Sequence, residues 1–216
     1  MSATDYEELF RLFDENKVSD TKYKQYLNLR NVLDDLKSLK EDDTKAVVMG
    51  FLHKWGKMAR VVGRKKAPAL TKVLRDLAPY FDAIKEINLE FLDLRALVLL
   101  RNQRMTVADV IKRIFNELYP ITKSTATSKA IHIINPNLFV MWDTRIRECA
   151  GCFGNAEGYL NFMMRQHVIA REALDSYKRD HRCSDGEAKK QIEDKYEGMP
   201  FTKLLDLYNY KKIREK

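Results

Sequence analysis

The stretch that decides the fold is KAIHIINPNLFVMWDTRIRECAG, residues 129–151. It carries no formal charge from Ala130 to Trp142 and then changes abruptly at Asp143, with Arg145 and Arg147 close behind. A carboxylate directly after so apolar a run is poorly solvated unless hydrogen-bond donors are supplied to it. Asp is also a favoured residue at the start of a helix. Asp143 is therefore either a helix cap or a reactive group.

The regions on both sides of this stretch have helical patterns almost throughout. Apolar residues recur at spacings of three and four, and the chain has only five prolines and eight glycines in 216 residues. The expected helices are Tyr6–Phe13, Asp20–Leu39, Asp43–Val62, one from Pro68 to about Phe81, one within 89–100, Thr106 to Pro120, Ser124 to Ile134, one from Asp143, Glu157–Arg179, Ser184–Tyr196 and Phe201–Ile213. We predict an all-α fold in which residues 1–216 form one compact unit.

Charge is concentrated in one segment. The formal net charge is +8, yet residues 44–75 contain nine Lys and Arg and no Asp or Glu. The basic loop within it includes Arg60, Arg64, Lys65 and Lys66. Such a segment is either a solvated face or a surface that follows the phosphates of a nucleic acid, whose binding weakens steeply with salt.

The composition limits the other classes. No apolar run is long enough for a membrane span, and the acidic start MSATDYEE predicts no signal peptide and an intracellular protein. Three cysteines cannot form a full set of disulfides. Cys149 and Cys152 form a C-x-x-C that would need Cys183 and His181 to complete a metal site, so free thiols are the preferred interpretation and we expect no metal or cofactor.

Residues 106–150 then read as a helix-hairpin-helix-like element followed by an Asp-bearing helix start. The segments LYPITKSTA (118–126) and FVMWDTRIR (139–147) resemble the hairpin, the Thr-Ala pair and the Asp-Thr-x-x-Arg of the helix-hairpin-helix DNA glycosylases, the superfamily of endonuclease III. The strong part of this resemblance covers about 40 residues. It implies a helical fold with two lobes, and double-stranded DNA as the partner of a monomeric enzyme of base excision repair.

The resemblance also implies roles for individual residues. Asp143 would stabilise the oxocarbenium-like sugar while the N-glycosidic bond of a damaged or mismatched base breaks. The hairpin residues Thr122, Ser124 and Thr125, together with Arg145 and the basic loop, would bind DNA, with hairpin amides facing a phosphate. Lys123 would be the amine that forms a Schiff base if AP lyase activity accompanies base removal.

The chain departs from the family at several positions. Pro120 and Thr122 stand where the family hairpin usually has glycines, and the family's lysine position falls on Ser124, one residue after Lys123. Lys129 lies further along the same helix, and the sequence leaves open which residue faces the pocket. His132 and Trp142 are interpreted as core residues. A nucleic-acid-binding protein without catalysis, and an interaction protein with a solvated basic face, are the alternatives to a glycosylase.

Overall fold

The protein is mostly helical, with one small two-stranded sheet, as the sequence predicts at the level of fold class. The computed structural model describes residues 9–11, 21–100 and 102–214. The α-helices are α2 (Thr21–Leu29), α3 (Glu41–Asp43), α4 (Ala67–Ala83), α5 (Val107–Ile134), α6 (Thr144–Cys149), α7 (Ala156–His181), α8 (Asp185–Lys195) and α9 (Phe201–Arg214). Most of the expected helix Tyr6–Phe13 lies outside the described residues.

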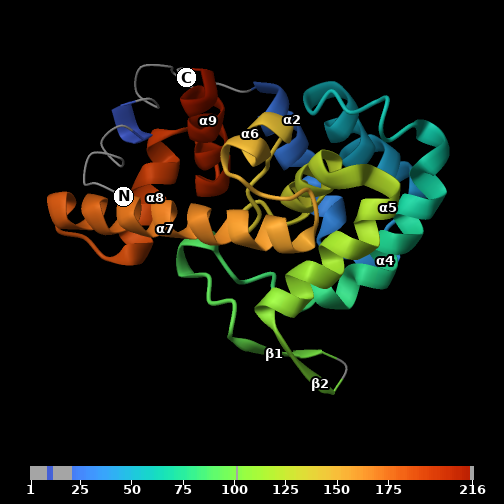
Figure 1. Cartoon of the computed structure of the whole chain (residues 1–216), viewed down its shortest axis with the longest axis horizontal. Helices are drawn as coiled ribbons and strands as arrows, with labels where there is room; N and C mark the ends of the chain where they lie inside the picture. The colour runs from blue at the N-terminus through green and yellow to red at the C-terminus, as the bar shows by residue number, and fades with distance from the viewer. Residues whose placement is uncertain (1–8, 12–20, 101, 215–216) are drawn as a thin grey trace.

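The helices enclose one apolar core. Figure 1 shows α7 running across the molecule, α4 beside α5, and α2, α6 and α9 at the opposite side from the β-hairpin. The buried run Leu138–Trp142 leaves a turn at Leu138 and continues through the core as an irregular segment that is not paired in a sheet. Its last residue, Trp142, packs edge-on against Phe115 of α5 and Tyr159 of α7. The apolar run therefore anchors the chain just before it reaches the surface at Asp143.

Residues 89–100 do not form the expected core helix. They form a 3-10 turn, Leu89–Phe91, and the strand β1 (Leu97–Leu100), which pairs antiparallel with β2 (Gln103–Thr106). The Asp93 carboxylate accepts the Arg95 amide in a local turn, and Asn102 adopts a positive φ at the hairpin. Leu97 and Leu99 are 61 % and 70 % exposed, because alternate residues of a strand face the same side. The prediction of a core helix at 89–100 is therefore wrong.

The segment 30–66 is less regular than predicted. The expected helix Asp20–Leu39 ends at Leu29 and continues as 3-10 turns, Arg30–Leu33 and Leu36–Ser38. The next helix begins at Glu41, with the Asp43 carboxylate accepting the Lys40 amide. It then widens into π-helical stretches, Thr44–Met49 and Phe51–Trp55, and ends well before Val62. The loop 56–63 and a 3-10 turn, Arg64–Lys66, lead into α4.

Helix α5 bends sharply in the region where the sequence predicts a hairpin turn. Helical geometry continues through Pro120, which was expected to end the first helix, and breaks instead at Lys123, whose φ and ψ are 61° and 167°. Figure 1 shows the two halves of α5 meeting at this bend. The second half ends at Ile134, before Asn135-Pro136, as predicted. We call the junction the Lys123 bend.

Candidate functional site

Asp143 is both the cap of α6 and part of an open surface. Its Oδ1 accepts the amide of Ile146 at 2.8 Å, as expected of a residue that begins a helix. The side chain is half-buried and lines two neighbouring cavities. The carboxylate is thus not sealed behind the start of its own helix, which is the condition that a chemical role requires.

The position of Asp143 is fixed by bonds from the preceding residue to α5. The Trp142 indole donates to the Ser124 carbonyl at 3.3 Å, and the Trp142 amide donates to the Ser128 hydroxyl at 3.2 Å. Ser128 in turn donates to the Thr125 carbonyl at 2.9 Å. Asp143 and the Lys123 bend are therefore held together through one buried tryptophan, although 20 residues separate them in sequence.

The first cavity lies between the Lys123 bend and α6, and we call it the bend cavity. Its volume is about 560 Å³. Its walls contain Met58, Val61, Tyr119, Thr122, Lys123, Ser124, Thr125, Ala126, Asp143, Thr144, Arg145 and Arg147. It therefore brings together Asp143, Lys123, the three hairpin residues and Arg145, as the sequence predicts for one site.

The hairpin residues differ in what they can offer a ligand. The Thr122 hydroxyl is fully buried and bonded to the Leu118 carbonyl and to Thr127, so it supports the bend and is not free to bind DNA. Ser124 is 8 % exposed, and its hydroxyl has no hydrogen-bond partner in the described part of the chain. The Lys123 ammonium is exposed and lies 5.6 Å from the Tyr119 ring centre. The amides after the bend begin a new helical segment, which favours an anion.

Arg147 contributes to the same wall from α6. It is half-buried and lies 3.6 Å from Glu148. A Cβ placed on Gly154 would come within 2.6 Å of the Arg147 guanidinium and 3.4 Å of the Ser124 hydroxyl. Gly154 therefore leaves the space in which Arg147 lies beside the unpartnered Ser124 hydroxyl.

The second cavity lies on the other side of Asp143, and we call it the lysine cavity. Its volume is about 300 Å³, and its walls contain Trp55, Lys129, Trp142, Asp143, Ile146, Lys203, Asp206, Leu207 and Tyr210. The Lys129 ammonium donates to the Gly56 carbonyl at 3.2 Å and lies 5.4 Å from the Trp55 ring centre. The Lys203 ammonium donates to Asp206 at 2.9 Å and lies 4.6 Å from the same ring.

The environment of Lys129 shifts its proton equilibrium toward the neutral amine. Burial lowers the pKa of Lys129 below its usual value. The negative charges of Asp206 and Asp143 oppose this shift, whereas the positive charge of Lys203 reinforces it. A desolvated lysine beside a second cation is a recognised arrangement for an amine nucleophile. The sequence leaves the direction of the Lys129 side chain open and gives no signal for Lys203 or Asp206.

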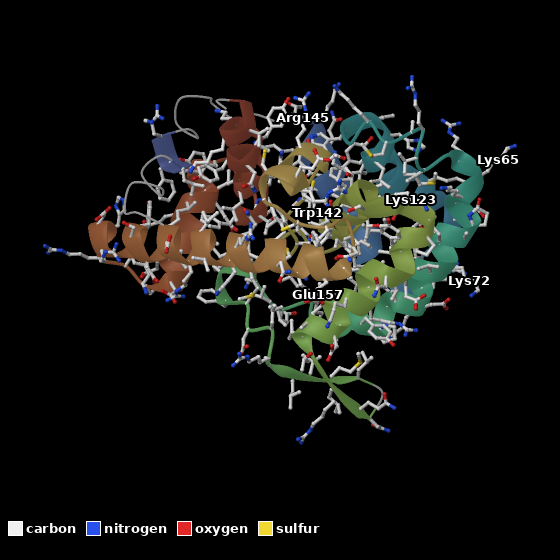
Figure 2. All side chains as sticks on the ribbon, in the orientation of Figure 1. Lys65, Lys72, Lys123, Trp142, Arg145 and Glu157 are labelled. Atoms are coloured by element: carbon white, nitrogen blue, oxygen red, sulfur yellow. The ribbon has the colours of Figure 1, made fainter. Side chains whose placement is uncertain are left out.

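The cations of the basic loop do not line the two cavities that Asp143 borders, although Met58 and Val61 of the same loop line the bend cavity. Arg60, Arg64 and Lys65 are exposed, and Figure 2 shows Lys65 and Lys72 at the outer edge of the molecule, far from Trp142. The Lys66 ammonium donates to the Val61 carbonyl at 2.9 Å and to the Ile121 carbonyl at 2.7 Å. It ties the loop to the Lys123 bend, so its predicted phosphate contact is replaced by a structural role.

The remaining candidates belong to the core. His132 is fully buried, donates from Nδ1 to the Phe139 carbonyl at 2.5 Å and accepts the Tyr23 hydroxyl at 2.7 Å. Its burial lowers its pKa from 6.5 to about 4. Trp142 is also buried, so both are core residues as predicted. The three cysteines are free thiols, and the described residues contain no group of three or more His, Cys, Asp or Glu that could hold a metal.

Comparison with known proteins gives no match: no protein-family model, no curated protein and no solved structure is significantly similar to this chain. Within the described residues, no helix has the length and apolar character to cross a lipid bilayer. Function is therefore inferred from the residues around Asp143.

Proposed function

We propose that this protein is a DNA glycosylase of the helix-hairpin-helix type, which hydrolyses the N-glycosidic bond of a damaged or mismatched base in double-stranded DNA. One observation carries the proposal: Asp143, at the end of a buried apolar run, borders two cavities, one lined by the Lys123 bend and one containing two lysines. The mostly helical fold is compatible with the two-lobed architecture of that class.

Asp143 has the chemistry that the reaction needs. When the bond between C1′ and the base breaks, the base leaves with the bonding electrons and the sugar acquires positive charge. A carboxylate at a partly desolvated cavity wall stabilises that charge more strongly than one in water. One Asp143 oxygen accepts the Ile146 amide, which fixes the orientation of the carboxylate.

The bend cavity supports binding of the DNA backbone. The amides after Lys123, Arg145 and the half-buried Arg147 provide donors and positive charge on a single wall. Arg60, Arg64 and Lys65 would add phosphate contacts further along the molecule. Because each phosphate neutralised releases counterions, the affinity for duplex DNA should fall steeply with salt.

If strand cleavage accompanies base removal, Lys129 is a better candidate than Lys123 for the amine that forms the Schiff base. Lys129 shares a cavity wall with Asp143, and its pKa is lowered by burial. Lys123 also shares a wall with Asp143, but its side chain is exposed. Borohydride trapping on abasic DNA tests this assignment: Lys129→Gln should abolish the covalent adduct, and Lys123→Gln should keep it. The reverse pattern would return the role to Lys123.

The proposed function is tested with duplexes that carry uracil, 8-oxoguanine, an alkylated base or a mismatch. Excision of at least one base by the parent protein, lost in Asp143→Asn, is the expected result. Glu148→Gln is the matched control, because it removes a carboxylate of the same helix that is exposed and outside both cavities. If the parent protein excises no base from any of these duplexes, the proposal that it is a DNA glycosylase is rejected.

A second candidate is a nucleic-acid-binding protein without catalysis. It is favoured by the position of Arg60, Arg64 and Lys65, which are exposed and do not line the cavities of Asp143. In that case the affinity for duplex DNA would depend on salt and on these cations, and Asp143→Asn would leave this affinity unchanged.

A further inference from the structure

A separate hollow lies on the far side of the loop that carries the basic residues. Its volume is about 1000 Å³, and it is enclosed by the π-helical stretches 44–55, the turn Arg64–Lys66 and the start of α4. Its lining residues are Glu41, Asp42, Lys45, Ala46, Met49, Gly50, His53, Lys54, Arg64, Lys65 and Pro68. We call it the basic hollow. Neither Asp143 nor the Lys123 bend contributes to it, so it is not part of the site described above.

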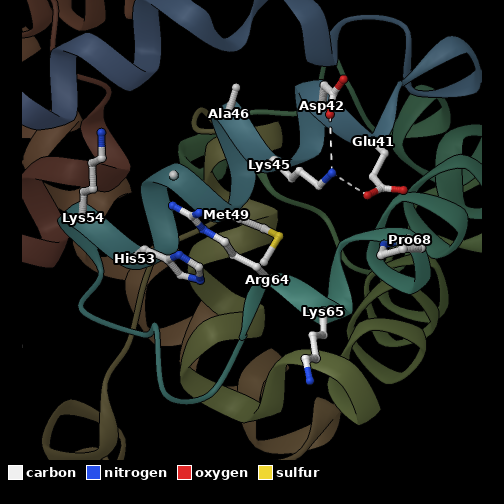
Figure 3. A pocket seen from close by; sticks show the side chains of 11 residues that line it. Glu41, Asp42, Lys45, Ala46, Met49, His53, Lys54, Arg64, Lys65 and Pro68 are labelled. Atoms are coloured by element: carbon white, nitrogen blue, oxygen red, sulfur yellow. Dashed lines mark hydrogen bonds and ion pairs between the residues drawn. The ribbon is translucent and has the colours of Figure 1, made fainter.

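The charges in the basic hollow are unequally neutralised. Lys45 forms ion pairs with Glu41 at 2.6 Å and Asp42 at 3.4 Å, so both acids of the lining are engaged by one cation. For Arg64, Lys65 and Lys54 the described part of the chain contains no ion pair with a carboxylate. Figure 3 shows Arg64 beside Met49 and His53, whereas the side chains of Lys54 and Lys65 lie at the rim and extend away from Arg64. An excess of positive charge therefore remains on one side.

The floor of the basic hollow is apolar. Ala46, Met49 and Pro68 provide it, and Gly50 adds no side chain. His53 closes one side, with its Nε2 bonded to the Val62 carbonyl. Arginine is suited to phosphate because its planar guanidinium can donate two parallel hydrogen bonds. An apolar floor beside such a group fits the flat ring of a base, and a pocket of this size accepts a ligand larger than a bare ion.

We propose that the basic hollow binds a nucleoside monophosphate group, with the phosphate held by Arg64 and Lys65 and the base placed on Met49 and Pro68. The group could come from a free nucleotide or from the 5′ end of a DNA strand, and the chemistry of recognition is the same for both. The site stands independently of the chemistry at Asp143.

The binding also reaches the candidate active site through the loop. Arg64 and Lys65 directly precede Lys66, whose ammonium bridges the carbonyls of Val61 and Ile121. Val61 lines the bend cavity, and Ile121 lies two residues before the Lys123 bend. A ligand that orders Arg64 and Lys65 therefore acts on the same loop that forms a wall of the bend cavity.

The test is calorimetric titration of the full chain with dAMP, inorganic phosphate and deoxyadenosine at one ionic strength. We expect dAMP to bind more tightly than either fragment. Replacing both Arg64→Gln and Lys65→Gln should weaken dAMP binding by about tenfold or more, because charge-assisted hydrogen bonds are lost. The matched control is Lys57→Gln with Lys72→Gln, which removes the same charge from the same basic segment outside the hollow. Its affinity for dAMP should stay within about twofold of the parent.

A dinucleotide with a 5′ phosphate, compared with its 5′-hydroxyl form, identifies the source of the group. Binding of the phosphorylated dinucleotide but not of dAMP, with the same dependence on Arg64 and Lys65, assigns the hollow to a strand end. Equal weakening by both double variants would show that only net charge matters and would overturn the site, as would failure of both phosphorylated probes to bind. Asp143→Asn should bind dAMP normally, so this result is independent of whether the protein removes bases.

Discussion

Lys123 occupies a backbone conformation that favours glycine. Substitutions at this position can therefore distinguish the effect of backbone strain from the effect of losing the amine. A residue with φ of 61° and ψ of 167° lies in a region that only glycine populates readily. Holding another residue there costs about 1–3 kcal/mol. Glycine removes that strain but has more conformational freedom in the unfolded chain, which costs about 0.5–1 kcal/mol relative to alanine. Lys123→Gly should therefore be more stable than Lys123→Ala by about 1 kcal/mol.

The two variants form a matched pair, because both remove the amine and its contact with the Tyr119 ring. Only the glycine variant relieves the backbone. The free energy of unfolding is measured by urea titration, with the fluorescence of Trp55 and Trp142 as the signal. An alanine variant as stable as the glycine variant, or more stable, would refute the strain at the bend. Base excision should survive in both variants, and its loss in both would assign the Lys123 amine to the mechanism.

Three further predictions concern the surroundings of the site. Native His132 has a pKa of about 4 and the unfolded residue about 6.5, so the unfolded chain binds more protons between these pH values. The free energy of unfolding should therefore fall by up to about 3 kcal/mol as the pH drops from 6.5 to 4. Urea titrations of His132→Gln should show a weaker dependence of this free energy on pH. The raised pKa of Glu193, caused by burial, acts in the opposite direction in both proteins and cancels in the comparison; an unchanged slope would contradict the assignment. Gly154→Ala should displace the Arg147 guanidinium and weaken duplex binding in fluorescence anisotropy by about tenfold, with little loss of stability, and an unchanged Kd would count against Arg147. Lys66→Met leaves the Val61 and Ile121 carbonyls without their donor and should lower the free energy of unfolding, measured by urea titration, by about 1–3 kcal/mol. An unchanged free energy of unfolding would show that these two hydrogen bonds do not stabilise the loop.

Local signals in the sequence predicted the helix starts well. The Thr106 hydroxyl accepts the Asp109 amide, and Asp143 accepts the Ile146 amide, as the capping residues at these positions predict. Caps depend on neighbours three residues away, which the sequence displays directly. These signals placed Asp143 at a helix start, which agrees with the structure. Its place beside the Lys123 bend was expected only from the resemblance to the glycosylases.

Features set by backbone conformation or by distant segments were missed. Pro120 predicted the end of a helix, but the break falls at Lys123, where nothing in the residue type indicates a positive φ. The run 97–100 was apolar enough for a core helix and forms an exposed hairpin strand instead. Trp55, Lys129 and Lys203 meet in the lysine cavity from segments far apart in the chain, which no spacing in the sequence could indicate.

The proposed mechanism depends on the Asp143 carboxylate, which stabilises the sugar while the base leaves. The most direct measurement is the single-turnover rate of base excision by Asp143→Asn at saturating protein, beside the parent and Glu148→Gln, on the duplex that the parent cleaves best. We predict a fall of about 10²–10³-fold for Asp143→Asn, as when one electrostatic stabiliser is removed from an active site, with an unchanged Kd for the duplex. An excision rate of Asp143→Asn within about threefold of the parent rate would contradict this mechanism.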